Sequence, residues 1–328
     1  MINILFVGDL HLQVSSPVNR TDNLIETTTK KFDEIYSLVV EHDVDFILIP
    51  GDIFNGGQVS NTTLVFAKEL LSRSPVDIFV TPGNHDLFNY NINTLERSSL
   101  RVLADLVPQL NIKLSSTTPL IHQDNKGNSV YITFQEFTNE LDKDNSTGYS
   151  SELVQDSSIN IRVIHSMLLD HKPPFDQYTL INDVKTNNDI VVSGHDHTGF
   201  GIIQRADKKY FMNPGSLLRL AASKNEINRQ VQVGLITVKY KSASLKLIPL
   251  KSAKKGSEVL NRESIEENNE RAYAMEEFST LLQKDGVNYK VDILTVLSEI
   301  AKVEAVETSL LEQVKEKVLK FMTKGDKK

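Results

Sequence analysis

The chain has 328 residues, of which 40% are hydrophobic and 24% are charged, and it contains no cysteine. This composition is typical of a globular protein with one large domain and an appendage, or with two modest domains. Without cysteine the chain forms neither disulfides nor thiolate metal sites, so a metal ion would have to bind through Asp, Asn and His side chains. The net charge of −7 argues against a protein that coats nucleic acid by charge alone.

The N-terminus runs from Met1 directly into an apolar segment, without a basic region or a small-residue cleavage site. This pattern is not that of a signal peptide. No apolar run approaches the ~20 residues that a membrane-spanning helix needs. We therefore expect a cytoplasmic protein that does not enter a membrane.

The first 81 residues alternate between short apolar runs and helical patterns. The apolar spacing predicts strands at 2–7, 45–50 and 76–81, and helices at 23–42 and 62–73. A βαβαβ order predicts parallel strands with right-handed crossovers. We therefore predict an α/β fold.

Further along, the apolar period shortens toward 2. Residues 110–136 predict a hairpin with a turn at 125–128, and the polar stretch 138–158 predicts a loop with a short helix. The remaining predicted strands are 160–165, 189–193, 201–204 and 209–212, followed by a closing hairpin at 231–240 and 244–249.

The composition changes near residue 251, where a linker-like segment begins. Beyond it, only helical patterns are present, at 262–283 and 290–322. We therefore divide the chain into a domain at 1–250 and a helical extension at 251–328. The apolar stripes of the extension must be buried, either as a cap on their own domain or against a partner.

Polar motifs rich in Asp and His follow most of the predicted strands. Because parallel strands end at one edge of a sheet, the loops that follow them come together there. These loops can gather two or three carboxylates, one amide oxygen and several imidazoles, which form a ligand set for two divalent metal ions. The candidate ligands are Asp9, His11, Asp52, Asn84, His165, His195 and His197.

The spacing of these residues suggests individual roles. Asp52 is suited to be the carboxylate that both ions share. Asp9 and His11 are two positions apart, so both can turn toward one ion. The motif that contains His195 repeats this spacing, so that each of its two imidazoles can serve one ion. His85 is left without an ion to bind and is the natural proton donor to a leaving oxygen, with Asp86 placed to hold it charged and oriented.

The ordered motifs Asp-x-His, Gly-Asp, Gly-Asn-His-Asp, a lone His and Gly-His-x-His resemble those of the calcineurin-like metallophosphoesterase superfamily, over about residues 1–250. The resemblance implies a four-layer αββα sandwich with a two-metal site at the strand ends, and His85 as the catalytic acid. It also implies two ligand sets that share one carboxylate. These sets are Asp9, His11, Asp52 and His197 for one ion, and Asp52, Asn84, His165 and His195 for the other.

Within this superfamily, the Gly-Asp-Ile-Phe motif, residues 213–219 and the helical extension resemble SbcD-type DNA repair and recombination nucleases, and the short length resembles their phage-encoded branch. The resemblance implies cleavage of DNA with manganese, an SMC-like ATPase partner of the SbcC type, and a homodimer. Magnesium, iron and zinc are the alternative metals. The chain departs from the pattern at Asn55 and Val59, which puts DNA positioning in question but not metal binding.

Three further residues are candidate substrate contacts. The backbone amides around Ser216 can face a phosphate or form a simple turn. Arg219 can contact a phosphodiester, and His171 lies close enough to His165 in the sequence to reach a substrate.

Two other functions stay open. The first is a phosphodiesterase or phosphatase for small molecules such as cyclic nucleotides, with the helical extension as a cap over its pocket. The second is a non-catalytic subunit whose metal site is structural. The complete ligand set and the presence of His85 argue against the second, because a scaffold does not need an acid.

Overall fold

The computed structural model describes residues 1–261 and residue 315. The helices predicted at 262–283 and 290–322 lie outside the described residues, apart from Lys315, which is helical. Among the described residues, no helix is long and apolar enough to cross a membrane.

The first sheet contains the predicted βαβαβ opening. Its strands β1, β2, β3 and β4 are parallel, and two strands from much later in the chain, β13 and β14, extend it antiparallel beyond β1. The parallel crossovers and the closing hairpin are therefore confirmed. In spatial order, the strands are β14 (Ser242–Pro249), β13 (Gln232–Lys239), β1 (Ile2–Phe6), β2 (Phe46–Ile49), β3 (Asp77–Val80) and β4 (Leu110–Ile112).

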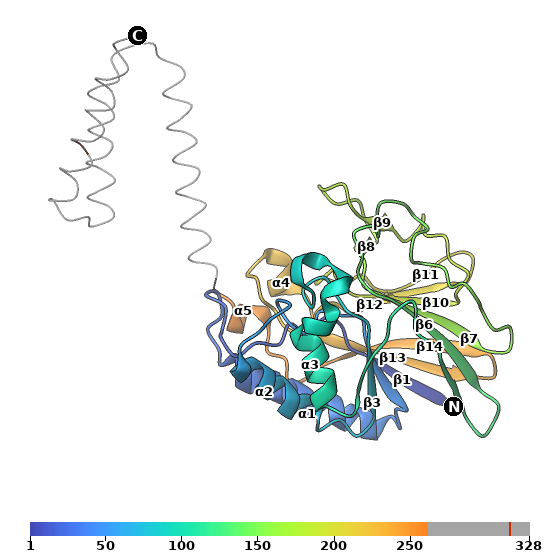
Figure 1. Cartoon of the computed structure of the whole chain (residues 1–328), viewed down its shortest axis with the longest axis horizontal. Helices are drawn as coiled ribbons and strands as arrows, with labels where there is room; N and C mark the ends of the chain where they lie inside the picture. The colour runs from blue at the N-terminus through green and yellow to red at the C-terminus, as the bar shows by residue number, and fades with distance from the viewer. Residues whose placement is uncertain (262–314, 316–328) are drawn as a thin grey trace, which may run out of the picture. The chain divides into compact units, whose positions relative to one another are not determined.

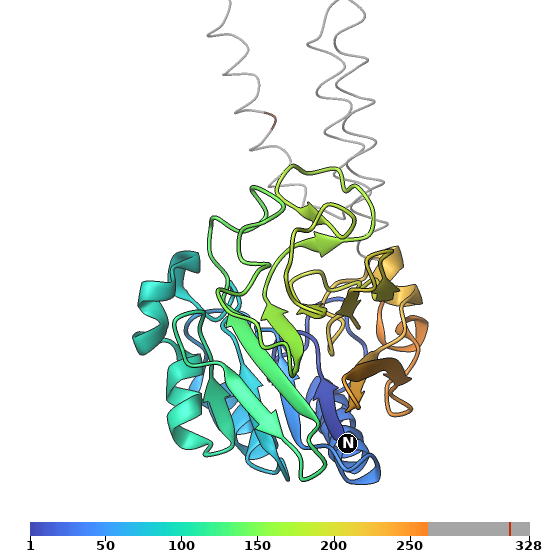
Figure 2. The same ribbon diagram turned by 90° about the vertical axis from the view of Figure 1, so that its right-hand side faces the viewer.

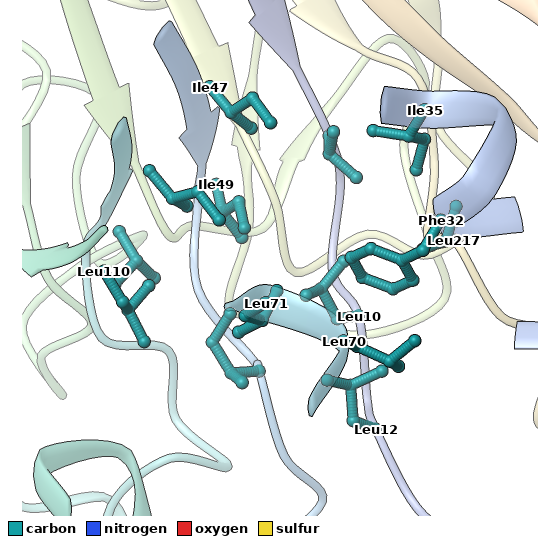
Figure 3. Packing of buried hydrophobic residues seen from close by; sticks show 14 of the residues in the cluster. Leu10, Leu12, Phe32, Ile35, Ile47, Ile49, Leu70, Leu71, Leu110 and Leu217 are labelled. Atoms are coloured by element: carbon teal, nitrogen blue, oxygen red, sulfur yellow. The ribbon is translucent and has the colours of Figure 1, made fainter. Parts of the chain in front are cut away.

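Helices α1 (Leu24–Glu41), α2 (Asn61–Leu71) and α3 (Ser99–Leu106) cover the outer face of this sheet (Figure 1). The first two begin within one residue of the predicted positions, because the side chains of Asn23 and Ser60 accept hydrogen bonds from backbone amides of the first turn. Their apolar faces meet the residues that follow β1 in one buried cluster, in which Leu10 and Leu12 lie near Phe32 and Leu70 (Figure 3). This packing fixes the course of the chain just past β1.

The second sheet packs on the inner face of the first, and the two are seen together in Figure 2. Side chains at alternate positions, such as Ile4 and Phe6 from the first sheet and Ile161 and Val163 from the second, form the core between the sheets. In spatial order, its strands are β11 (Gly201–Gln204), β12 (Tyr210–Asn213), β10 (Ile190–Ser193), β7 (Ile159–Ile164), β6 (Ser129–Gln135) and β5 (Leu120–Gln123).

The α/β class with two packed sheets is confirmed, but two local predictions are wrong. The hairpin predicted over 110–136 contains only β5 and β6, because β4 instead joins the first sheet beside β3. The segment 138–158 forms turns without a helix, in keeping with its many Asn, Asp, Ser and Gly residues.

On the outer face of the second sheet, loops and the short strands β8 (Leu168–Leu169) and β9 (Thr179–Leu180) stand where the predicted sandwich has a helical layer. Buried side chains such as Tyr149 and Val184 from these loops pack against Val191 and Phe211 of the sheet. In the described part of the chain, the fourth layer is therefore built mostly from loops.

The remaining short elements are the 3-10 helices η1 (Phe88–Tyr90) and η2 (Ile92–Arg97), and the helices α4 (Lys224–Asn228) and α5 (Gly256–Val259). The first compact unit of the chain runs from Met1 to Arg262. Within it, Val259 and Leu260 are buried. Residues 251–261 therefore belong to this unit, although the sequence predicts a linker at their start.

Candidate metal centre

The predicted ligands follow neighbouring parallel strands in both sheets. In the first sheet, they come after β1, β2 and β3, and in the second sheet they come after β7 and β10. Because the two sheets pack face to face, these loops meet at one end of the core. Two groups of side chains with metal-ligand geometry result, and they share one carboxylate. The groups are Asp9, His11, Asp52 and His197, and Asp52, His165 and His195.

In the first group, all the candidate ligand atoms lie within 4.8 Å of one another. Nε2 of His11 lies 2.8 Å from Nε2 of His197 and 3.6 Å from Oδ2 of Asp52. Nε2 of His197 lies 3.7 Å from Oδ2 of Asp9. These nitrogen and oxygen atoms lie close enough together to bind one cation.

The second group adjoins the first through Asp52. Nε2 of His165 lies 3.5 Å from Oδ2 of Asp52 and 3.0 Å from Oδ1 of Asn84. His195 completes this group, in which the ligand atoms again lie within 4.8 Å of one another. The structure thus brings all seven predicted ligands together, with Asp52 between the two cation sites.

The protonation chemistry of the first group fits a bound cation. Burial lowers the pKa of His11 to about 4, and burial with the charge of His11 lowers that of His197 to about 3, so both rings are neutral at pH 7 and offer lone pairs. Oδ1 of Asp9 and Oδ2 of Asp52 are buried without a hydrogen-bond partner. Buried polar atoms seldom lack a partner, and a divalent cation would supply one here.

The backbone is strained at three of the ligands. His11, Asp52 and His195 have φ angles of 48°, 52° and 73°, in the left-handed region that residues with a side chain seldom adopt. Such strain costs about 1–3 kcal/mol per residue and concentrates at functional sites. The strained backbone therefore lowers the stability of the fold and turns these three side chains toward the centre.

Hydrogen bonds to the backbone orient the ligands. Oδ1 of Asp52 accepts from the amide of His85 at 2.9 Å, and Oδ2 of Asp9 accepts from the amide of His195 at 2.9 Å. Nδ1 of His165 lies 2.9 Å from the carbonyl oxygen of Pro50. When Nδ1 carries the proton and donates to this oxygen, Nε2 is left free to bind a cation.

His85 lies beside the first group, with its ring centroid 5.4 Å from that of His11. The expected role of Asp86 differs from what the structure shows. Its two carboxylate oxygens accept hydrogen bonds from the amides of Phe54 and Gly83, and within the described residues none joins Asp86 to the His85 ring. Asp86 therefore holds the two loops together and does not orient the imidazole.

Two of the predicted substrate contacts are structural residues. Ser216 is 2% exposed, and its hydroxyl group donates to the carbonyl oxygen of Leu218. Arg219 is 4% exposed, and its guanidinium group donates to three backbone carbonyl oxygens. The backbone amides of Ser216 and Leu217 are also taken, by the carbonyl oxygens of His197 and Asp9. Because burial keeps these amides and the Arg219 guanidinium away from a phosphodiester, the prediction for both residues is wrong. His171 is exposed beside Asp170, and its role stays a prediction.

The loop at residues 216–219 instead supports the metal ligands. Its amides donate to the carbonyl oxygens of His197 and Asp9, at 3.0 and 2.8 Å. Its own four carbonyl oxygens accept from the cationic side chains of Arg20, Lys31 and Arg229, at 2.7 to 3.0 Å. No sequence pattern indicated this arrangement, because buried cations have no characteristic spacing.

Two aromatic residues near the centre were also missed. The ring centroid of Phe137 lies 6.2 Å from that of His165 and 5.8 Å from that of His195. The ring of Tyr90 lies 6.3 Å from that of His85. Phe137 comes two residues after β6, just as the metal ligands come after their strands, and this position could have revealed it.

Two packed sheets with two candidate cation sites at their strand ends are the arrangement that a dinuclear metal-dependent hydrolase requires. The chain belongs to the calcineurin-like phosphoesterase family, whose sequence model matches residues 2–199, more than half of the chain. The protein is therefore a hydrolase of phosphoric ester bonds.

The double-strand break repair protein MRE11 of Arabidopsis thaliana is 38% identical over 74 residues, which cover 22% of this chain and 10% of that protein. The chain thus matches only about a tenth of the length of this relative. A dimetal phosphatase from Danio rerio is 9% identical with a TM-score of 0.45, covering 76% of this chain and 96% of that one. An archaeal phosphodiesterase is 13% identical with a TM-score of 0.35, covering 75% and 100%.

Proposed function

We propose that the protein is a DNA nuclease subunit that hydrolyses phosphodiester bonds with two manganese ions. One observation supports the hydrolase activity above all: Asp52 belongs to both ligand groups, and the imidazole of His85 lies beside them. The local identity to a double-strand break repair protein and the nuclease-like motifs favour DNA as the substrate.

When bound, the two ions lower the pKa of water and stabilise negative charge on the phosphoryl oxygens. The chain's own residues position and protonate the reacting groups. Asp52 is held by the amide of His85, so the shared ligand and the acid belong to one hydrogen-bonded unit. His85, which is partly exposed, donates a proton to the leaving oxygen.

The cleavage of labelled duplex and single-stranded DNA with Mn²⁺ tests this proposal. Replacing His85→Ala removes the acid and should slow cleavage by about 10²–10⁴-fold. Metal content should be unchanged, because His85 is not a ligand. His122→Ala is the matched control, since this half-buried histidine pairs with Val130 near the opposite end of β6.

Unchanged cleavage by the metal-loaded His85→Ala protein would refute the role of His85. Hydrolysis of bis-p-nitrophenyl phosphate without cleavage of any DNA would identify a phosphodiesterase for small molecules instead. A metal-loaded protein that cleaves no phosphodiester would identify a structural subunit.

As part of the same proposal, the protein is cytoplasmic, forms a homodimer and binds an SMC-like ATPase of the SbcC type. The motivation is the apolar stripe at 293–321, which needs a surface to bury it. Purification of the untagged full chain from its own host should recover an ATPase with it. Recovery of the protein without an ATPase would argue for a cap on its own domain.

A further inference from the structure

Two aromatic side chains from opposite sheets meet beside the metal centre. Tyr90 ends the 3-10 helix η1, which follows β3 of the first sheet, and Phe137 follows β6 of the second. Their ring centroids are 6.2 Å apart, with an angle of 69° between the rings. We call this pair the aromatic rim. It contacts both the predicted acid, through Tyr90 and His85, and the second ligand group, through Phe137 and His195.

The fold holds Tyr90 at the surface although burial would be favourable. Its side chain is among the exposed large apolar groups, at 50% exposure. Tyr90 and the preceding Asn89 have φ angles of 58° and 50°, and a left-handed conformation is a genuine outlier for a bulky residue. Two consecutive strained residues that keep an aromatic ring beside a reaction centre suggest a binding role.

Phe137 is fixed more firmly. Its backbone amide donates to the carbonyl oxygen of Pro82 at 2.9 Å, which ties the end of β6 to the loop that carries Asn84 and His85. The ring is partly exposed and lies against the rings of His165 and His195. One ring of the pair is therefore anchored to the metal centre, and the other extends the aromatic surface outward.

We propose that the aromatic rim is a stacking platform for a nucleobase attached to the scissile phosphate. This inference rests on the proposed function and narrows its substrate class to nucleotides. A phosphoester placed between the two ligand groups would bring its organic substituent against the neighbouring side chains. Flat π systems bind aromatic rings through stacking, which is independent of base identity and therefore suits an enzyme that cuts many sequences.

Calorimetric titration of the full-length, Mn²⁺-loaded protein tests the proposal with two ligands. One is thymidine 5′-phosphate, and the other is its tetrahydrofuran analogue, which lacks the base. Stacking on one base changes affinity by about 5- to 150-fold. We expect the wild type to prefer the nucleotide by a factor in this range. The preference should fall toward unity in Tyr90→Ala and in Phe137→Leu, and persist in Tyr90→Phe.

Tyr240→Ala is the matched control, because Tyr240 is also an exposed tyrosine in left-handed conformation, with 75% exposure and a φ of 50°, but lies in the turn between β13 and β14. The Tyr240→Ala protein should prefer thymidine 5′-phosphate over the analogue without the base by the same factor as the wild type. Equal affinities for the two ligands in the wild type would overturn the inference, as would an unchanged preference in both Tyr90→Ala and Phe137→Leu.

The ratio of the two affinities separates this inference from the nuclease proposal. A local disturbance of the metal ions would weaken both ligands alike and leave the ratio unchanged. A protein that prefers the base but cleaves no DNA would contradict the nuclease proposal and leave the platform in place. A protein that cleaves DNA without any preference for the base would do the reverse.

Discussion

The substitution Gly83→Ala should disrupt both cation sites, although Gly83 is not a ligand. A Cβ atom at this position would lie 2.1 Å from Oδ1 and 2.5 Å from the backbone nitrogen of Asp52. Ordinary contacts begin at 3.4 Å. Because the clash involves backbone as well as carboxylate, no change of side-chain rotamer alone relieves it. The two loops must separate by about 1 Å, and a misplacement of that size costs roughly 10²-fold in rate.

Metal content by mass spectrometry and kcat/KM for bis-p-nitrophenyl phosphate measure this effect. The expected result is a loss of metal in both sites, since Asp52 belongs to both ligand groups, and a fall in kcat/KM of about 10²-fold or more. Gly56→Ala is the control, because a Cβ there would lie 3.7 Å from its nearest neighbour. If Gly83→Ala kept both ions and matched the kcat/KM of Gly56→Ala, the assignment of Asp52 as the shared ligand would be wrong.

Two predictions concern pH. Burial would lower the pKa of His165, but the carboxylates of Asp52, Asp9 and Asp86 together outweigh burial and raise it from 6.5 to about 9. This proton therefore stabilises the metal-free protein fully below pH 6.5, and the stabilisation is lost as the pH rises through 9. Metal binding displaces the proton, so the affinity for metal measured by calorimetry should rise about tenfold per pH unit from the pKa of about 7, to which burial raises Asp9, up to pH 9. An affinity independent of pH would contradict this. Burial and the charge of Arg20 lower the pKa of Lys31 well below 10.5, so the unfolded chain binds more protons at alkaline pH and the free energy of unfolding rises with pH, by at most about 1.4 kcal/mol per unit. Denaturant titrations of wild type and Lys31→Met should diverge accordingly, and parallel curves would refute the shift.

Much of the fold follows from the sequence because its central strands are apolar on both faces. Strand β2, Phe46–Ile49, is wholly buried, and such runs between polar loops are visible without a structure. Helix α3 was missed because its eight residues, Ser99–Leu106, carry only a short apolar pattern. Strand β4 was assigned to the wrong sheet because a period of 2 does not specify which strand is the neighbour.

The metal centre was predictable for a similar reason, since its ligands follow strands in short recognisable motifs. The role of Arg219 was not predictable in the same way. An arginine after a Pro-Gly turn has the chemistry of a phosphate contact, and only the structure shows that its donors are used by backbone carbonyl oxygens. Whether such an arginine contacts a phosphate depends on the direction of its side chain, and a sequence motif does not encode where a long side chain points. Tyr90 escaped notice because Phe88 and Tyr90, in a short and otherwise polar segment, are too few to set a helical or strand period.

The late position of β13 in the chain has a consequence for biosynthesis. Every candidate ligand precedes residue 198, yet β1, whose end carries Asp9 and His11, has β13 as its neighbour on one side. A ribosome that has translated 199 residues has made every ligand, but β1 is still an open edge and Ile236 is missing from the core between the sheets. Unpaired edges promote aggregation. The nascent protein therefore passes through an interval in which it holds all its metal-binding groups and needs protection until the strand that closes the sheet emerges.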